Sequence, residues 1–238
     1  MMSRFKTIFY DLESKIMHKK YPAGTLLPSE HQLAHHYSVS RETIRKSLNL
    51  LREAGYIQKV QGKGSLVLDV NRTELPISGL TSYKEVQASQ NLDGKTIVHS
   101  NQLIKAPRDI AEQLEINVGD PVHELIRTRQ TEGEDVILDY DYLLPKFFEA
   151  LPTEKMSKSL YDYIEKDLGY DIGYAKKEFT VEPILESDMK YMTIKNDPFV
   201  VVTRSKVYFE DTQLFQFTES RHRLDKFRFV EFARRKIV

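Results

Sequence analysis

The sequence predicts an α+β protein in two parts: three short helices with a two-stranded hairpin, followed by a larger part built on a mostly antiparallel sheet. Apolar residues recur at helical spacing within the first 55 residues. Two β-prone runs joined by Gly-Lys-Gly come next. Beyond a polar stretch, six strand-like segments follow, and the short turns 131–134 and 210–212 are typical of hairpins.

The charges are divided unevenly along the chain. The 238 residues carry 35 Lys or Arg and 35 Asp or Glu, yet residues 1–70 hold 11 basic against 6 acidic residues. A basic N-terminal part on a mildly acidic body indicates that one part meets an anion. With 40% hydrophobic residues the chain can bury a core.

The absence of cysteine excludes disulfides, thiolate catalysis and cysteine-ligated zinc, and it fits a reducing cytoplasm. No run approaches the roughly 18 apolar residues that a membrane span needs. We therefore expect a soluble cytoplasmic protein without a membrane partner, and we expect no metal site and no cofactor.

The first two helices are predicted from spacing and from a capping pattern. Phe5, Ile8, Leu12 and Ile16 lie on one face of a helix, which ends at Tyr21-Pro22-Ala23-Gly24. A short helix over 29–36 follows, because Ser29 and Gln32 form the S-x-x-Q pattern that satisfies free amides at a helix start.

A third helix begins after Ser40, whose side chain can cap the amide near Thr43, and Gly55 is placed to end it. The runs on either side of Gly62-Lys63-Gly64 then form a hairpin with a flexible basic tip. Three helices and such a hairpin describe a winged helix-turn-helix.

The third helix can read DNA, since a helix fits the major groove and its first turn reaches base edges. Arg41 can bind guanine, Glu42 can accept from cytosine, and Thr43 can touch a thymine methyl group or a phosphate. Lys46 and Lys63 suit phosphate. In the alternative reading, the basic residues form a solvated face and Glu42 only favours the helix N-terminus.

The C-terminal part mixes helices and strands. Helix-like segments lie near 82–90, 107–116, 159–168 and 186–194, and strand-like segments lie near 95–104, 122–131, 135–143, 172–182, 198–209 and 213–222. We place the DNA-binding domain at 1–70, a linker at 71–80, and an effector-binding and dimerisation domain at 81–238.

An anion site is predicted around Arg127 and Arg129, because residues two apart in a strand share a face. Their planar guanidinium groups suit phosphate. Ser159 and Tyr161 offer hydroxyls near a predicted helix start, which favours anions, and Asp139 and Gln216 are of the kind that bonds sugar hydroxyls. Alternatively, the arginines pair with acids such as Glu132 or Asp141, and Tyr161 belongs to the core.

The N-terminal part resembles the DNA-binding head of GntR-type bacterial transcription regulators. The likeness is carried by Leu27-Pro28-Ser29-Glu30, Ser40-Arg41-Glu42-Thr43-Ile44-Arg45-Lys46, and Gly55-Tyr56-Ile57 with Gly62-Lys63-Gly64. It implies DNA contacts by Arg41 and Arg45 and a wing contact by Gly62 and Lys63. Many members have a phosphate-contacting arginine where this chain has His31, a weaker contact when neutral. The predicted DNA-binding set is Ser29, His31, Ser40, Arg41, Glu42, Thr43, Arg45, Lys46, Gly62, Lys63 and Gly64.

The second part resembles the effector domain of the HutC branch of that family, a fold similar to chorismate lyase. The likeness is carried by Gly79-Leu80-Thr81-Ser82-Tyr83, Arg127-x-Arg129, Ser159-x-Tyr161 and the run 215–229. It implies a sugar-phosphate effector. The predicted phosphate set is Ser82, Tyr83, Arg127, Arg129, Ser159 and Tyr161; the sugar set is Asp139, Gln216 and His222. Amino-sugar sensors have Glu, Glu and Tyr at the three sugar positions.

Within this branch the whole chain is most similar to the trehalose operon repressors of Gram-positive bacteria. That likeness implies a homodimer that binds a palindromic double-stranded operator and is released by trehalose 6-phosphate. An amino-sugar phosphate or glucose 6-phosphate is the alternative effector. An enzyme acting through Asp139 and Asp141 is disfavoured, because no nucleophile elbow, glycine-rich phosphate loop or metal-ligand set accompanies them.

Overall fold

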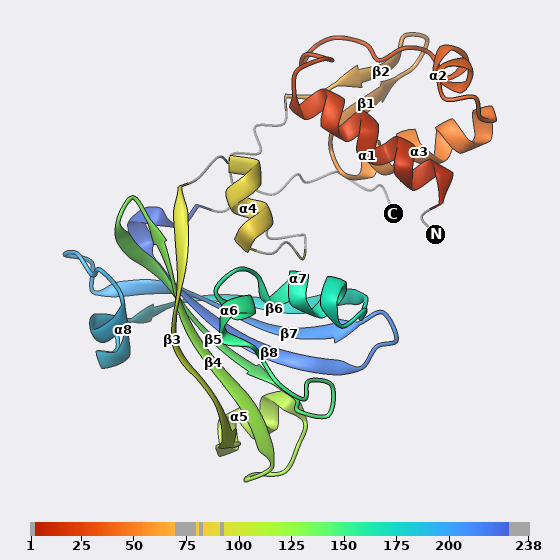
Figure 1. Cartoon of the computed structure of the whole chain (residues 1–238). Helices are drawn as coiled ribbons and strands as arrows, with labels where there is room; N and C mark the ends of the chain where they lie inside the picture. The colour runs from red at the N-terminus through yellow and green to blue at the C-terminus, as the bar shows by residue number, and fades with distance from the viewer. Residues whose placement is uncertain (1–2, 70–79, 81–82, 91–92, 229–238) are drawn as a thin grey trace. The chain divides into compact units, whose positions relative to one another are not determined.

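The computed structural model describes residues 3–69, 80, 83–90 and 93–228 (Figure 1). These residues fall into two compact units, one made of residues 3–69 and the other of residues 80, 83–90 and 93–228. The predicted linker at 71–80 therefore lies, except for Leu80, outside the described residues.

The first unit holds three helices and a hairpin. Its elements in chain order are α1 (Arg4–Met17), α2 (Glu30–His36), α3 (Arg41–Glu53), β1 (Ile57–Val60) and β2 (Gly64–Val67). Ser29 and Gln32 form the capping box of α2, and Ser40 accepts a hydrogen bond from the Thr43 amide at 3.2 Å to cap α3. Gly55 takes a φ of +82° just after α3, a conformation that glycine adopts without steric cost.

The apolar faces of these helices meet in one core. Its buried residues include Leu12 of α1, Leu33 of α2, Ile44 and Leu51 of α3, and Ile57 of β1. Polar contacts fasten the same helices, since the Tyr37 hydroxyl bonds Asp11 and the Tyr56 hydroxyl bonds Glu13. This packing leaves the first turn of α3 and the hairpin tip exposed.

The second unit is built on one antiparallel sheet of six strands in the order β3-β4-β5-β8-β7-β6. The strands are β3 (Gly94–Lys105), β4 (Pro121–Thr131), β5 (Glu134–Leu143), β6 (Ile172–Pro183), β7 (Phe199–Phe209) and β8 (Leu214–Arg223). The hairpins β4-β5 and β7-β8 come together where β8 pairs with β5. The predicted α+β class with a mostly antiparallel sheet is confirmed.

Helices pack on both faces of this sheet. On one face lie α6 (Thr153–Met156), α7 (Leu160–Asp162) and the π-helical turn Tyr163–Asp167, whose apolar side chains join Phe148, Phe209 and Phe215 in a core cluster. On the other face α5 (Arg108–Leu114) packs on Val122 and Phe217. Figure 1 shows α6 and α7 in front of the strands and α4 (Tyr83–Gln90) near the end of β3.

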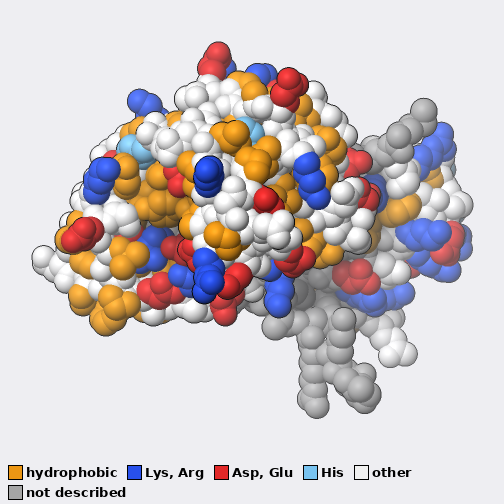
Figure 2. Space-filling view, turned by 90° about the horizontal axis from the view of Figure 1, so that it is seen from below, with side chains coloured by type: hydrophobic (Ala, Val, Ile, Leu, Met, Phe, Trp, Pro, Cys, Tyr) orange, Lys and Arg blue, Asp and Glu red, His pale blue; other side chains and the backbone are white. Residues whose placement is uncertain are grey.

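A buried ion pair fixes α8 (Glu186–Tyr191) to the same face of the sheet as α5. The Arg221 Nε atom donates to Asp188 at 2.7 Å, and both side chains are almost fully buried. On the face shown in Figure 2, basic and acidic side chains are interspersed with hydrophobic ones. No helix among the described residues is long and apolar enough to span a membrane.

Candidate functional site

The first candidate site is the exposed first turn of α3. Arg41, Glu42, Arg45 and Lys46 are exposed there, and Thr43 is half-buried because it packs under the Ser40 cap. The Arg45 Nε atom donates to Glu30 at 2.9 Å, which holds the guanidinium group against α2. A DNA group that binds Arg45 would either replace Glu30 as its partner or contact the guanidinium nitrogens that Glu30 leaves free.

His31 contacts a side chain of the neighbouring helix α3. The Arg41 guanidinium group donates to His31 Nδ1 at 3.2 Å. Because a guanidinium group can only donate, Nδ1 is the acceptor in this contact. His31 therefore supports the orientation of Arg41 on α3.

The tip of the hairpin β1-β2 forms a second exposed element of this unit. Gly62 and Gly64 have φ values of +77° and +117°, so the turn depends on glycine. A Cβ atom at either position would meet nothing within 4 Å. Lys63 is exposed between them.

The second candidate site is a pocket in the second unit. Every described residue of the predicted effector site lines it; these are Tyr83, Arg127, Arg129, Asp139, Ser159, Tyr161, Gln216 and His222. Ser82 lies outside the described residues. Strands β4, β5 and β8 supply most of the side chains, α7 and its preceding residue supply Ser159 and Tyr161, and α4 supplies Tyr83.

Two buried ion pairs form the wall of the pocket. Arg127 donates to Asp141 at 2.6 Å and Arg129 donates to Asp139 at 2.8 Å. Both arginines line the same pocket, as their spacing predicts, and the alternative pairing of Arg127 with Asp141 also occurs. Burial alone would raise the pKa of Asp139, but Arg129, Arg127 and the Ser220 hydroxyl together hold that pKa below its usual value.

Asp141 also orients a neighbour across the sheet. Its second oxygen accepts from Gln216 Nε2 at 2.7 Å, which leaves Gln216 Oε1 facing away from the carboxylate. Gln216 Oε1, Arg127 Nε and Thr203 Oγ1 are buried and have no hydrogen-bond partner among the described residues. Buried polar atoms without partners are rare and costly, so these three atoms make the pocket a candidate site for water or a polar ligand.

Burial shifts the pKa values of two aromatic side chains in the pocket. Burial raises the pKa of Tyr161 and lowers the pKa of His222 to about 4, with Asp139 acting against the latter shift. His222 is therefore neutral at pH 7, so that one of its ring nitrogens can donate and the other can accept. Arg129 lies 4.8 Å from the centre of the Tyr83 ring, a cation-π contact that joins α4 to the wall.

Several pocket residues were not named from the sequence. Ser220 and Thr218 lie between Gln216 and His222 on β8, and the two-residue alternation of a strand would have found them. Lys177 and Thr203 come from β6 and β7, whose place in the sheet depends on long-range pairing. No local pattern reveals that pairing.

No group of three His, Cys, Asp or Glu side chains among the described residues is arranged to hold a metal ion. His35 and His36, which stand together in the sequence, lie exposed at the end of α2.

Comparison with known proteins identifies the family of each unit. Residues 5–67 match the family model of bacterial regulatory proteins of the gntR family, and residues 89–228 match the UTRA domain. The HTH-type transcriptional regulator TreR of Bacillus subtilis is 45% identical over 234 residues, which cover 98% of each chain. The mannosyl-D-glycerate system repressor MngR of Escherichia coli is 25% identical, covering 98% of this chain and 96% of its own.

Solved structures give the same picture. The possible transcriptional regulator YydK of Bacillus subtilis superposes over 98% of this chain and 100% of its own with a TM-score of 0.82 at 23% identity, a likeness of fold. The effector-binding domain of the B. subtilis trehalose repressor TreR is 47% identical, with a TM-score of 0.56 over 60% of this chain and 99% of that structure. The chain therefore belongs to the GntR family of bacterial transcription regulators, in the HutC-type branch that carries a UTRA effector domain.

Proposed function

We propose that this chain represses a trehalose uptake and utilisation operon and that trehalose 6-phosphate releases it from operator DNA. The observation that carries the proposal is the pair of buried arginines, Arg127 and Arg129, in the wall of one pocket that also presents unpaired polar atoms. The 45% identity with TreR over 98% of both chains supports the choice of sugar.

The charge of the pocket suits a phosphate group. Two carboxylates, Asp139 and Asp141, face five cationic side chains, which are Lys84, Arg127, Arg129, Lys158 and Lys177. Asp141 and Asp139 pair with the two arginines, and Asp162 and Glu154, outside the lining, pair with Lys84 and Lys158. Arg127 Nε, buried without a partner among the described residues, is a donor of the kind that a phosphate oxygen accepts.

The neighbouring polar groups suit sugar hydroxyls. Gln216 Oε1 can only accept, because it is a carbonyl oxygen, and the amide nitrogen beside it donates to Asp141. Asp139 is ionised, and His222 is neutral because its pKa lies near 4. Each of these three groups can accept a hydrogen bond from a hydroxyl of a sugar bound beside the arginines.

On the DNA side, the proposed reader is the first turn of α3 with the tip of the hairpin. One such helix reads few base pairs, so the functional unit is a homodimer on a two-fold operator. The effector induces only if it binds more tightly to a dimer geometry whose two heads no longer fit the half-site spacing.

Calorimetry of the full chain with trehalose 6-phosphate, trehalose, glucose 6-phosphate and an amino-sugar phosphate tests the effector. Trehalose 6-phosphate should bind most tightly and should release operator DNA while remaining intact. Tighter binding of a monosaccharide phosphate contradicts the proposed sugar. Hydrolysis of trehalose 6-phosphate by the protein contradicts a purely regulatory role.

A further inference from the structure

The floor of the effector pocket extends well beyond the arginine wall. In the strand register, Asp141 lies opposite Thr218, Thr218 opposite Ser205, and Ser205 opposite Lys177. Directly paired residues of neighbouring strands project from the same face. This row therefore crosses from β5 through β8 and β7 to β6, and all four side chains line the pocket.

A second row runs beside the first. Asp139 lies opposite Ser220, Ser220 opposite Thr203, and Thr203 opposite Phe179. The two rows make a floor of hydroxyl groups that ends at a lysine and an aromatic ring. From β5 to β6 the floor spans three strand spacings, about 14 Å, which is longer than a single hexose ring.

The far end of this floor has a polar atom that lacks a partner. Thr203 Oγ1 is buried and makes no hydrogen bond to any described residue, and Ser205 beside it is 5% exposed. A buried hydroxyl without a partner costs free energy, which a ligand hydroxyl would recover. This atom lies two strands from β5, beyond the residues that face the proposed phosphate.

Lys177 and two aromatic rings complete the far end. The ammonium group of Lys177 can donate three hydrogen bonds, and the side chain lines the pocket, where burial lowers its pKa. The rings of Phe179 and Phe227 lie 6.5 Å apart and also line the pocket. A lysine donor beside apolar rings suits a sugar, whose hydroxyls accept hydrogen bonds and whose C–H faces pack on aromatic groups.

We propose that Lys177, Thr203 and Ser205 form a distal subsite that holds the second, unphosphorylated hexose of a disaccharide phosphate. This inference rests on the proposed function, which puts the phosphate at Arg127 and Arg129. The arginine wall binds the phosphate group. The far end of the floor selects ligands that are long enough to carry a second hexose.

Two substitutions in the full-length protein test the distal subsite by calorimetry. Lys177→Met should weaken trehalose 6-phosphate binding about tenfold or more, and Thr203→Val about three- to tenfold, because each removes a contact to the second ring. Lys176→Met is the matched control, since Lys176 is the neighbouring exposed residue of β6 on the opposite face, and it should bind like the wild type.

The pattern across ligands separates a subsite from general damage. Glucose 6-phosphate should bind the wild type and all three variants within twofold of each other, because it does not reach the far end. Thr203→Val should also raise the unfolding temperature of the ligand-free protein, because it removes an unpaired buried hydroxyl. A co-crystal structure should place the second ring within hydrogen-bond distance of Thr203 and Lys177.

Three outcomes would count against the inference. Unchanged trehalose 6-phosphate affinity in both variants, or a second ring turned away from β6, overturns the distal subsite and leaves the proposed effector standing. An equal loss for glucose 6-phosphate assigns Lys177 to the phosphate end and also overturns it. A wild-type protein that binds only monosaccharide phosphates overturns the disaccharide effector and the distal subsite together.

Discussion

At the scale of single residues, Asp141 fixes the orientation of two polar side chains that line the pocket. One carboxylate oxygen holds Arg127 and the other holds the Gln216 amide. The arginine therefore keeps a free Nε donor and the glutamine keeps a free Oε1 acceptor. A donor and an acceptor with fixed positions select ligands by the direction of their hydrogen bonds, which a hydrophobic pocket cannot do.

Arg127→Ala should abolish release of DNA by trehalose 6-phosphate while operator binding survives. The change removes the proposed phosphate contact and leaves Asp141 as a buried unpaired charge, so the free energy of unfolding should also fall by about 3–5 kcal/mol. The measurement is operator binding with and without the sugar phosphate.

A double variant separates these two effects. Arg127→Ala with Asp141→Asn should regain part of the lost stability and still fail to respond. Arg108→Ala, at an exposed position on α5, should respond normally. Normal induction in the Arg127 variants would remove this arginine from the effector site.

His222 should make the protein less stable in mild acid. The pKa of its imidazole is lowered from 6.5 to about 4 in the folded chain, so only the unfolded chain takes up the proton between these pH values. Stability is therefore lost as the pH falls from 6.5 towards 4, by a total on the order of 3 kcal/mol. Chemical unfolding at several pH values should show this slope, and His222→Gln should flatten it. An unchanged slope in the variant would assign the acid sensitivity to other groups.

Whether a residue of the site could be predicted from the sequence depends on how far along the chain its partners lie. Arg127 and Arg129 were predictable, because strand alternation alone puts them on one face. Their partners Asp139 and Asp141 come from the next strand of a hairpin. The sequence could therefore predict that the arginines pair with acids of that strand, but not which arginine pairs with which acid. Gln216, Lys177 and Thr203 could not be joined to them by local rules, since the pairing of β8 with β5 is a long-range event.

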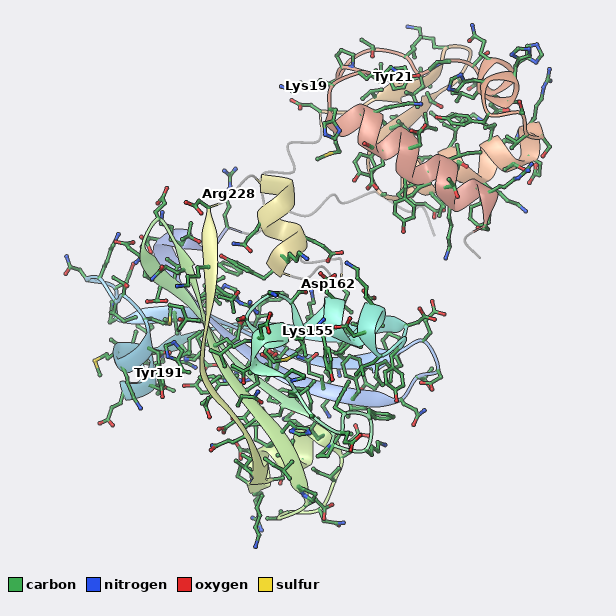
Figure 3. All side chains as sticks on the ribbon, in the orientation of Figure 1. Lys19, Tyr21, Lys155, Asp162, Tyr191 and Arg228 are labelled. Carbon is green, nitrogen blue, oxygen red and sulfur yellow. The ribbon has the colours of Figure 1, made fainter. Side chains whose placement is uncertain are left out.

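At the scale of elements, α4 touches the pocket through a few specific contacts. Its Tyr83 stacks on Arg129, and its Lys84 forms an ion pair of 2.6 Å with Asp162 at the end of α7. Figure 3 labels Asp162 on the side of α7 that is nearer to α4. A ligand that rearranges the arginine wall or α7 therefore acts on α4 as well.

The packing of α4 on β3 depends on Gly94. A Cβ atom there would lie 2.3 Å from Gln87 Nε2 and 3.0 Å from both the Tyr83 hydroxyl and the Gln130 carbonyl oxygen. Gly94→Ala should therefore displace Tyr83 from Arg129 and weaken effector binding several-fold, as measured by calorimetry.

Gly133→Ala provides the comparison. This turn glycine has a φ of +80° and open space around it, so alanine costs about 1 kcal/mol of backbone strain without touching α4. Effector affinity should stay unchanged there. Equal affinity in the Gly94 variant would show that α4 does not contribute to the site.

The elements themselves were largely predictable from the sequence. Strong alternation and short turns locate all six strands of the sheet, and caps at Ser29 and Ser40 locate the helices before the hairpin. The four-residue α6 was missed, because so short a helix has no periodic signal. The helix expected over 159–168 is instead one α-helical turn continued as a π-helical turn, a hydrogen-bond shift that composition does not encode.

At the scale of the whole molecule, the uneven charge predicts a strong response of DNA binding to salt. Residues 1–70 carry five more basic than acidic residues. Each phosphate contact releases counterions, so affinity should fall steeply between 50 and 200 mM salt. A flat dependence would contradict operator binding.

Two substitutions should divide affinity from specificity. Lys63→Ala should weaken binding to all sequences and lower the salt slope by about one per head, whereas Arg41→Ala should relax sequence preference at one base position per half-site. Binding titrations on the operator and on single-base variants measure both quantities. The same specificity profile for both proteins would contradict this division.

The order of strands in the sheet bears on how such a protein can change its sugar. Strand β6 pairs on one side only within the described residues, with β7, whereas β4 and β5 each have neighbours on both sides. A substitution that shifts the backbone of β6 affects one ladder of hydrogen bonds, whereas one that shifts β4, the strand of Arg127 and Arg129, affects two. The far end of the pocket is thus the tolerant end for engineering, and a sensor for a different phosphorylated sugar is best sought by varying β6 while leaving the arginines in place.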